Sequence, residues 1–249
     1  MAQLLGVLEQ GLIYAVLALG VYITFKILDF PDMTVDSTFP LGAAVTALMI
    51  SNGIHPLLTL PASLLAGAAA GALTGVIHVK FHVRDLLSGI IMMTGLYSIN
   101  LHIAGRANVQ LFSFNTLFKN DFISGLPTGV QPYAPVILMA LVALIVKLLM
   151  DAYLSTRSGF LLRATGDNPT LVASLAKDSG KVKILGLAIA NALVALSGCI
   201  MCQYQRYFDI SMGTGTLVLA VASVIVGTQL LRGLRFLRAT SAVVLGSIL

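Results

Sequence analysis

Charged residues are scarce in this sequence. Asp, Glu, Lys and Arg make up only 10% of its 249 residues, against about 25% in soluble domains. Hydrophobic residues make up 57%, the mean hydropathy is +0.94, and several runs reach the about 20 apolar residues that a helix needs to cross a bilayer. A soluble domain is therefore excluded, as is a membrane β-barrel, whose short strands alternate between apolar and polar residues. We predict an all-α, polytopic transmembrane helix bundle.

The sequence has only two cysteines, and it lacks the features of a cleavable signal peptide. Cys199 and Cys202 have the C-x-x-C spacing of redox sites, but they lie in an apolar stretch without the βαβ context of such a site. We therefore predict buried packing thiols. The first 25 residues lack a basic region and a small-residue cleavage site, so the first apolar run is expected to be a mature span.

Motifs for chemistry are missing as well. The pattern G-x-x-x-x-G-K-[ST] does not occur, and Ser179-Gly180-Lys181 is only a fragment of it. His78 and His82 have metal-ligand spacing, but no third ligand lies nearby. The net charge of +5 comes without a basic and aromatic patch, so no nucleic-acid partner is expected. The sequence predicts neither an enzyme nor a metal or cofactor site in this chain.

Eight apolar runs are expected to form about eight spans, some of them broken or re-entrant. They cover about residues 10–28, 38–52, 56–77, 86–104, 133–153, 183–203, 216–231 and 236–249. Pro40 lies near the start of the short second run, so the side of the N-terminus is left open. The last run stops at Leu249 without a polar flank, as in a chain that continues further. We treat residues 1–249 as one transmembrane domain.

Lys and Arg are distributed unevenly between the loops. The loops at 78–85, 154–183 and 232–238 carry most of them, namely Lys80, Arg84, Arg157, Arg163, Lys177, Lys181, Lys183, Arg232, Arg235 and Arg238. The loops at 105–132 and 204–215 carry only Arg106, Lys119 and Arg206. Because basic residues accumulate on the cytoplasmic side, we place the loop at 154–183 in the cytoplasm and the loop at 105–132 outside.

Two segments resemble each other and predict an internal repeat. DMTVDSTFPLGAAVTAL begins at Asp32, and DISMGTGTLVLAVASVI begins at Asp209; in each, a polar head precedes an apolar helix of small residues. Broken helices whose N-termini meet at a substrate path are typical of transporters, because unpaired N–H groups attract polar solutes. The candidate pathway residues are Asp32, Thr34, Ser37, Thr38, Met93, Tyr97, Asn100, Ser211 and Thr214.

Each of these candidates has a structural alternative. Asp32, Asp36 and Asp209 are also suited to cap helix starts. Asn100 and Asn191 are suited to hydrogen bonding between helices, and Met93 and Tyr97 to core packing. A separate pattern, Gly67, Gly71 and Gly75, has the four-residue spacing of a tight helix interface.

The stretch 163–183 is polar and contains residues that typically start and end helices. Asp167 or Asn168 is suited to cap a helix, Pro169 to occupy its first position, and Gly180 to end it, which predicts a helix over about 169–177. Leu171, Val172 and Leu175 form its apolar face. Such a helix is too short to span, so it lies on the bilayer or docks into another protein's groove.

Three segments carry a family resemblance: TRSGFLLRATGDNPTLVASLA from Thr156, LDFPDMTVDSTFPLGAAV from Leu28, and GIIMMTGLYSINLHIAGRAN at 89–108. The first two resemble the permease subunits of ATP-binding-cassette importers of the branched-chain amino acid and ribose type. The third is similar to a subgroup described as tryptophan/tyrosine-type permeases.

The resemblance implies a division of labour in the bacterial cytoplasmic (inner) membrane. Two permease copies form the pathway, cytosolic ATPase subunits bind ATP and magnesium, and an extracytoplasmic binding protein delivers amino acids or similar small organic solutes. The residues that couple this chain to the ATPase are then Gly166, Asp167, Asn168, Pro169, Leu171, Val172 and Leu175.

Two other classes stay open. A stand-alone secondary transporter or channel explains the repeat, but it leaves the cytoplasmic helix without a role and favours a buried ionisable group for ion coupling. A membrane scaffold or exporter subunit is the third class.

Overall fold

The structure is a computed structural model, and it describes all residues except 1, 121–124, 126–130, 169–171, 173–177 and 231–237. The described part is predominantly helical, as predicted. Five helical segments are long and apolar enough to cross a membrane: Leu5–Ile27, made of α1 (Ala2–Val21) and the π-helical η1 (Tyr22–Ile27), then α3 (Pro56–Lys80), α4 (Asp85–Ala104), α6 (Ala134–Leu154) and α9 (Ser179–Gln205).

Three further apolar helices are shorter. They are α2 (Val35–Ser51) with 17 residues, α10 (Thr216–Leu230) with 15 and α11 (Ala239–Ile248) with 10. These lengths fall below the about 20 residues of a full crossing. The prediction of a polytopic helix bundle is thus confirmed, and the predicted runs at 38–52, 216–231 and 236–249 correspond to the three short helices.

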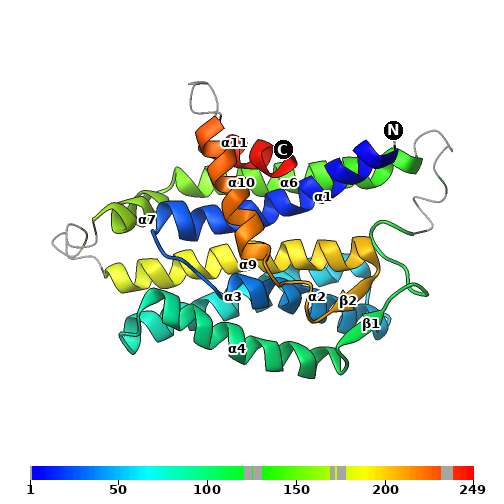
Figure 1. Cartoon of the computed structure of the whole chain (residues 1–249), viewed down its shortest axis with the longest axis horizontal. Helices are drawn as coiled ribbons and strands as arrows, with labels where there is room; N and C mark the ends of the chain where they lie inside the picture. The colour runs from blue at the N-terminus through cyan, green and yellow to red at the C-terminus, as the bar shows by residue number, and fades with distance from the viewer. Residues whose placement is uncertain (1, 121–124, 126–130, 169–171, 173–177, 231–237) are drawn as a thin grey trace.

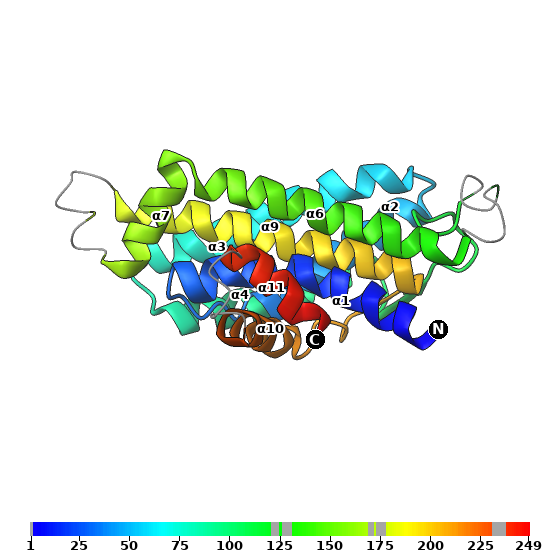
Figure 2. The same cartoon turned by 90° about the horizontal axis from the view of Figure 1, so that it is seen from above.

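Helix α9 lies in the middle of the bundle and packs against α3, α2 and α1 (Figures 1 and 2). The predicted glycine spacing explains the closest of these contacts. A Cβ atom on Gly67 or Gly71 would collide with backbone oxygens of α9, and one on Gly75 would lie 2.8 Å from the Cα atom of Ile184. Because only glycine leaves this space, the predicted tight interface is confirmed, and its partner is α9.

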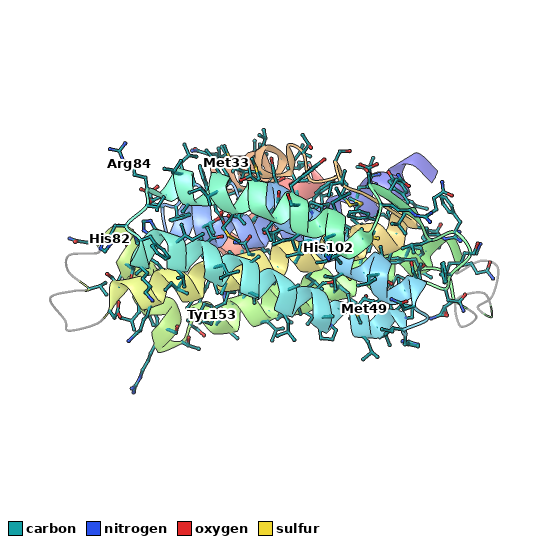
Figure 3. The ribbon with its side chains drawn as sticks, turned by 90° about the horizontal axis from the view of Figure 1, so that it is seen from below. Met33, Met49, His82, Arg84, His102 and Tyr153 are labelled. Atoms are coloured by element: carbon teal, nitrogen blue, oxygen red, sulfur yellow. The ribbon has the colours of Figure 1, made fainter. Side chains whose placement is uncertain are left out.

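Described residues from the basic loops at 78–85 and 154–183 lie at one end of the bundle. Lys183 Nζ lies 3.1 Å from His78 Nε2, which joins the start of α9 to the end of α3. His82 and Arg84 lie at this same end, where α7 (Arg157–Asp167) is also found (Figures 1 and 3). The opposite end holds the N-terminus and the ribbon of β1 (Asn108–Gln110) paired antiparallel with β2 (Tyr207–Asp209) (Figure 1). Between β1 and α6, the 3₁₀ turn η2 covers Gln131–Tyr133.

The loop at 154–183 differs from the prediction. It contains α7, which sequence analysis missed; the Thr156 hydroxyl accepts a hydrogen bond from the N–H of Gly159 at 3.3 Å and so caps this helix. The predicted helix at 169–177 lies outside the described residues, except for Val172. The assignment of Gly180 as a helix stop is wrong, because Gly180 lies in the first turn of α9.

The start of α9 shows why that assignment fails. The Asp178 carboxylate accepts hydrogen bonds from the N–H groups of Gly180 at 3.0 Å and Lys181 at 3.2 Å, so Asp178 caps the helix. A Cβ atom on Gly180 would collide with the side chain of Val79 at the end of α3. The glycine therefore serves close packing between two helices.

The two cysteines lie in α9, and both are free and buried. Cys199 Sγ lies 3.3 Å from the hydroxyl of Thr59. The prediction of packing thiols is confirmed.

Candidate functional site

The starts of α2 and α10 meet, although about 180 residues separate them in the chain. The carboxylate of Asp36, in the first turn of α2, accepts hydrogen bonds from the Leu217 N–H at 2.8 Å, the Thr216 hydroxyl at 3.1 Å and the Gly215 N–H at 3.3 Å. A helix start has unpaired N–H groups and a partial positive charge, both of which suit a carboxylate. Asp36 therefore caps α10, a helix to which it does not belong.

Backbone packing supports the same junction. A Cβ atom on Gly213 would collide with the carbonyl oxygen of Asp36, so glycine allows the turn before α10 to lie directly against α2. The polar heads of the two predicted repeat segments are thereby brought into contact.

A cavity of about 360 Å³ lies beside this junction, between α2, α4 and the turn before α10. It is lined by Asp36, Ser37, Met93, Thr94, Tyr97, Ile210 and Thr214. Four of the predicted pathway residues are among them: Ser37, Met93, Tyr97 and Thr214. Sequence analysis did not predict Asp36, Thr94 and Ile210 as lining residues. Asp36 and Thr94 are each next to a predicted residue, and Ile210 lies in the second polar head.

The lining combines polar groups with apolar walls. Met93, Tyr97 and Ile210 supply apolar surface, while Asp36 and Thr214 supply oxygen atoms. The Ser37 hydroxyl donates to the Met93 carbonyl at 2.7 Å and so ties α2 to α4. Tyr97 is 52% exposed, so the cavity opens toward the outside of this chain. Its volume and mixed lining suit a small organic solute.

Asp32 has a different environment from Asp36. It is 1% exposed, and its carboxyl accepts hydrogen bonds from the Asn191 side chain at 2.7 Å and from the Thr34 N–H at 2.9 Å. The Thr34 hydroxyl in turn lies 3.1 Å from that of Thr74. These residues, which we call the Asp32 network, join the start of α2 to α9 and α3 within the core, away from the cavity lining.

The remaining predicted pathway residues also lie off the cavity lining. Asn100 is buried and donates to the Ser37 carbonyl at 2.9 Å, which is the hydrogen bonding between helices that we considered as its alternative role. Thr38 is buried, and its hydroxyl has no hydrogen-bond partner among the described residues. Ser211 is exposed, and its N–H donates to Asp209 at 2.8 Å.

The predicted coupling residues fall into three groups. Gly166 in α7 packs so closely on η1 that a Cβ atom would collide with the Ile27 carbonyl oxygen. Asp167 and Asn168 are exposed at the end of α7, whereas Val172 is buried. Pro169, Leu171 and Leu175 lie outside the described residues.

A helical, multi-pass membrane protein with a cavity at the meeting of two short helices has the architecture of a transport protein. Comparison with known proteins agrees. Residues 3–249 match the family described as the branched-chain amino acid transport system permease component. The chain therefore belongs to this permease family, as the resemblance of its segments implied.

Individual relatives cover nearly the whole chain. It is 43% identical over 247 residues to the tyrosine transport system permease protein of Clostridioides difficile, an alignment that covers 99% of this chain and 80% of that protein. It is 28% identical to the ribose import permease protein RbsC of Escherichia coli, over 93% of this chain and 70% of that protein. A probable branched-chain amino acid transport permease protein, LivH of Methanocaldococcus jannaschii, is 26% identical over 91% of this chain and 75% of its own length.

Proposed function

We propose that this chain is the membrane-spanning subunit of an ATP-driven importer that moves amino acids or similar small organic solutes into a bacterial cell. The observation that carries the proposal is the cavity at the α2–α10 junction, in a chain whose residues 3–249 match a permease family. The relatives named for tyrosine, ribose and branched-chain amino acids all point to small solutes.

The cavity fits an amino acid better than a purely polar solute. Its walls offer Met93, Tyr97 and Ile210 to an apolar or aromatic side chain. Asp36 and Thr214 offer oxygen atoms to an ammonium group. A solute with both parts would use both kinds of lining, which is why we favour amino acids.

A second copy of the chain completes the pathway in this proposal. The exposure of Tyr97 and Thr94 leaves the cavity open on one side of a single chain. A symmetric partner would close that side and place two such cavities on one path. In this arrangement α2 is a partial crossing, and the eight predicted runs correspond, in the described residues, to five helical segments long enough to span and three shorter helices.

The two ends of the bundle then receive different partners in the bacterial cytoplasmic (inner) membrane. The basic end, with α7, faces the cytoplasm and an ATP-binding subunit that holds ATP and magnesium. The end with the β1–β2 ribbon faces outside and a solute-binding protein. ATP-driven closure of the cytosolic subunits moves the end of α7 and shifts the pathway from an outward to an inward state.

Copurification and uptake test this division of labour. We expect the tagged chain, purified in mild detergent, to bring a stoichiometric ATP-binding subunit, and we expect uptake by reconstituted vesicles to need ATP. Replacing Leu171 and Leu175 by Asp should abolish ATP-dependent uptake, whereas Lys181→Gln, at an exposed position of the same end, should not. A homo-oligomer that transports without ATP would instead support a secondary transporter or channel.

The cavity itself is tested by a matched pair on α4. Tyr97 lines the cavity and is 52% exposed, whereas Ile99 is 48% exposed and does not line it. We expect Tyr97→Ala to raise the KM of ATP-dependent uptake about tenfold, because about 1.4 kcal/mol of contact is lost. Ile99→Ala should leave KM unchanged. Equal effects of the two variants would argue against this cavity as the pathway.

A further inference from the structure

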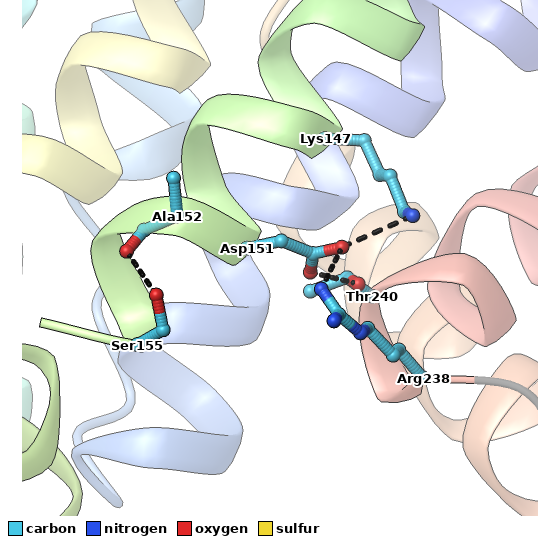
Figure 4. Close-up of polar contacts among 6 residues, drawn as sticks. All are labelled: Lys147, Asp151, Ala152, Ser155, Arg238 and Thr240. Atoms are coloured by element: carbon cyan, nitrogen blue, oxygen red, sulfur yellow. Dashed lines mark hydrogen bonds and ion pairs between the residues drawn. The ribbon is translucent and has the colours of Figure 1, made fainter.

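An ion cluster lies near the C-terminal end of α6, which faces the cytoplasm in the proposed orientation (Figure 4). The carboxylate of Asp151 lies 3.0 Å from Lys147 Nζ and 3.3 Å from an Arg238 guanidinium nitrogen, and it accepts a hydrogen bond from the Thr240 hydroxyl at 2.5 Å. The Asp151 side chain is only 7% exposed. The carboxylate is therefore fully engaged, and its two cationic neighbours leave a net positive charge.

A polar pocket of about 460 Å³ borders this cluster, between η1, α6, α7 and the start of α11. Arg163, Arg238 and Tyr22 line it. Among the described residues, neither the guanidinium of Arg163 nor the hydroxyl of Tyr22 has a hydrogen bond or an ion pair. The pocket thus offers unused donors and uncompensated positive charge, which together suit a phosphate group.

An apolar groove of about 330 Å³ continues from the cluster along α6, toward α1 and α11. Lys147 lines the groove beside Ala140, Leu144 and Leu245. At 1.5 Å per residue, Asp151 lies about 4.5 Å from the end of α6 at Leu154, and Ala140 about 21 Å from it. The groove therefore begins near the headgroup level and runs into a hydrocarbon core about 30 Å thick.

We propose that the pocket and the groove together bind one anionic phospholipid of the cytoplasmic leaflet. Arg163, Arg238 and Tyr22 donate hydrogen bonds to the lipid phosphate, and one acyl chain lies in the groove. Basic pockets between membrane helices on the cytoplasmic side are suited to such headgroups. The site goes beyond the proposed transport function and depends only on the orientation of the bundle.

Two features favour a lipid over an acidic side chain of a cytosolic partner. Tyr22 belongs to the segment Leu5–Ile27, which is long and apolar enough to cross the membrane, so a ligand that enters the pocket from the bilayer is favoured. The apolar groove would also have no role in a contact with a cytosolic protein. A free phosphate ion would use the pocket and leave the groove unused.

The test uses the full chain in detergent, titrated separately with dioleoyl phosphatidylglycerol, dioleoyl phosphatidylcholine and inorganic phosphate. Native mass spectrometry counts bound lipid, and thermal unfolding reports stabilisation. We expect binding of phosphatidylglycerol in preference to phosphatidylcholine. Arg163→Gln should raise the apparent Kd for phosphatidylglycerol about tenfold, whereas Arg157→Gln, on the same helix but outside the pocket, should not change it.

Two more variants keep the proposal falsifiable. Arg163→Lys keeps the charge and should recover part of the affinity, and the unfolding midpoint without lipid shows whether each variant is folded. Ala140→Trp fills the groove and should weaken lipid binding without changing any effect of inorganic phosphate.

Three results would overturn the proposal. Equal affinity for both lipids, or equal losses in Arg163→Gln and Arg157→Gln, would show non-specific binding. Full stabilisation by inorganic phosphate, together with lipid binding that Ala140→Trp does not weaken, would show a small-anion site. If the ATP-binding subunit no longer copurifies with Arg163→Gln while lipid affinity is unchanged, the pocket is a protein contact. Uptake assays test the transport function separately.

Discussion

Asp32 lies just before α2 and Asp36 lies in its first turn, yet the two carboxyl groups make different contacts. Asp32 is buried and holds α2 to α9 and α3 through Asn191 and Thr34. Asp36 lines the cavity and caps α10 across the junction. Because Asp32 precedes the first turn of α2, it does not have to share a helix face with Asp36, and two identical residues in one short segment serve the core and the cavity separately.

The difference shows how the two halves of the chain depend on each other. Asp209 begins the second polar head, but its carboxylate accepts hydrogen bonds from the N–H and hydroxyl of Ser211, within its own turn. The N–H groups at the start of α10 are satisfied from α2 instead. Any movement that separates α2 from α10 must therefore break the hydrogen bonds of the Asp36 cap.

Replacing each aspartate by asparagine gives the largest expected contrast. In Asp36→Asn an NH₂ group must face the N–H of either Gly215 or Leu217, which leaves a donor unpaired and costs about 1–3 kcal/mol. In Asp32→Asn the new NH₂ group faces Asn191, whose Oδ1 atom has no partner in the described part of the chain. Rotation of the Asn191 amide restores this hydrogen bond but gives up the one from its NH₂ group to the Leu187 carbonyl at 3.1 Å, so we expect a cost of about 1 kcal/mol.

Thermal unfolding in detergent measures the stability of both variants, and ATP-dependent uptake measures their transport activity. We expect Asp36→Asn to lower the unfolding midpoint and uptake more than Asp32→Asn does. The reverse order would mean that the core network, and not the α10 cap, holds the junction together.

A smaller effect is expected at Asp209 as the solution becomes acidic. The Ser211 hydroxyl and N–H, with a weaker contribution from Asn108, hold the pKa of Asp209 below its ordinary value. A lowered folded-state pKa stabilises the protein above the unfolded value of about 3.9, and this contribution is lost as pH falls through the folded pKa. Solvent screening limits it to a few tenths of a kcal/mol.

Unfolding midpoints between pH 7 and pH 3 test this sign. We expect the midpoint of the unchanged protein to fall slightly more than that of Asp209→Asn, because the variant has no carboxylate to protonate. An identical pH dependence for both proteins would show that the bonds around Asp209 contribute nothing to stability.

Local patterns predicted much of the fold. Gly67, Gly71 and Gly75 indicated a tight interface because their spacing puts them on one helix face. The uneven distribution of Lys and Arg predicted that the basic loops lie on one side, and the described residues of the loops at 78–85 and 154–183 do lie at one end. The polar heads at Asp32 and Asp209 indicated two helix starts near the cavity, and Ser37 and Thr214 do line it.

Other features depend on contacts between distant segments. Helix α7 was missed because its cap, Thr156, lies in a stretch with mixed polar and apolar residues and no long run. Gly180 looked like a helix stop, but Asp178 caps α9 and Val79 needs the space that glycine leaves.

The sequence by itself determined that this is a helical membrane protein with one basic end and polar breaks before two helices. Those properties follow from hydropathy, charge and local propensity, which act over a few turns. Only the tertiary structure decided that Asp36 caps α10 while Asp32 serves the core. A cap donated by another helix depends on which side chain faces the unpaired N–H groups after packing, and no spacing along the chain encodes that.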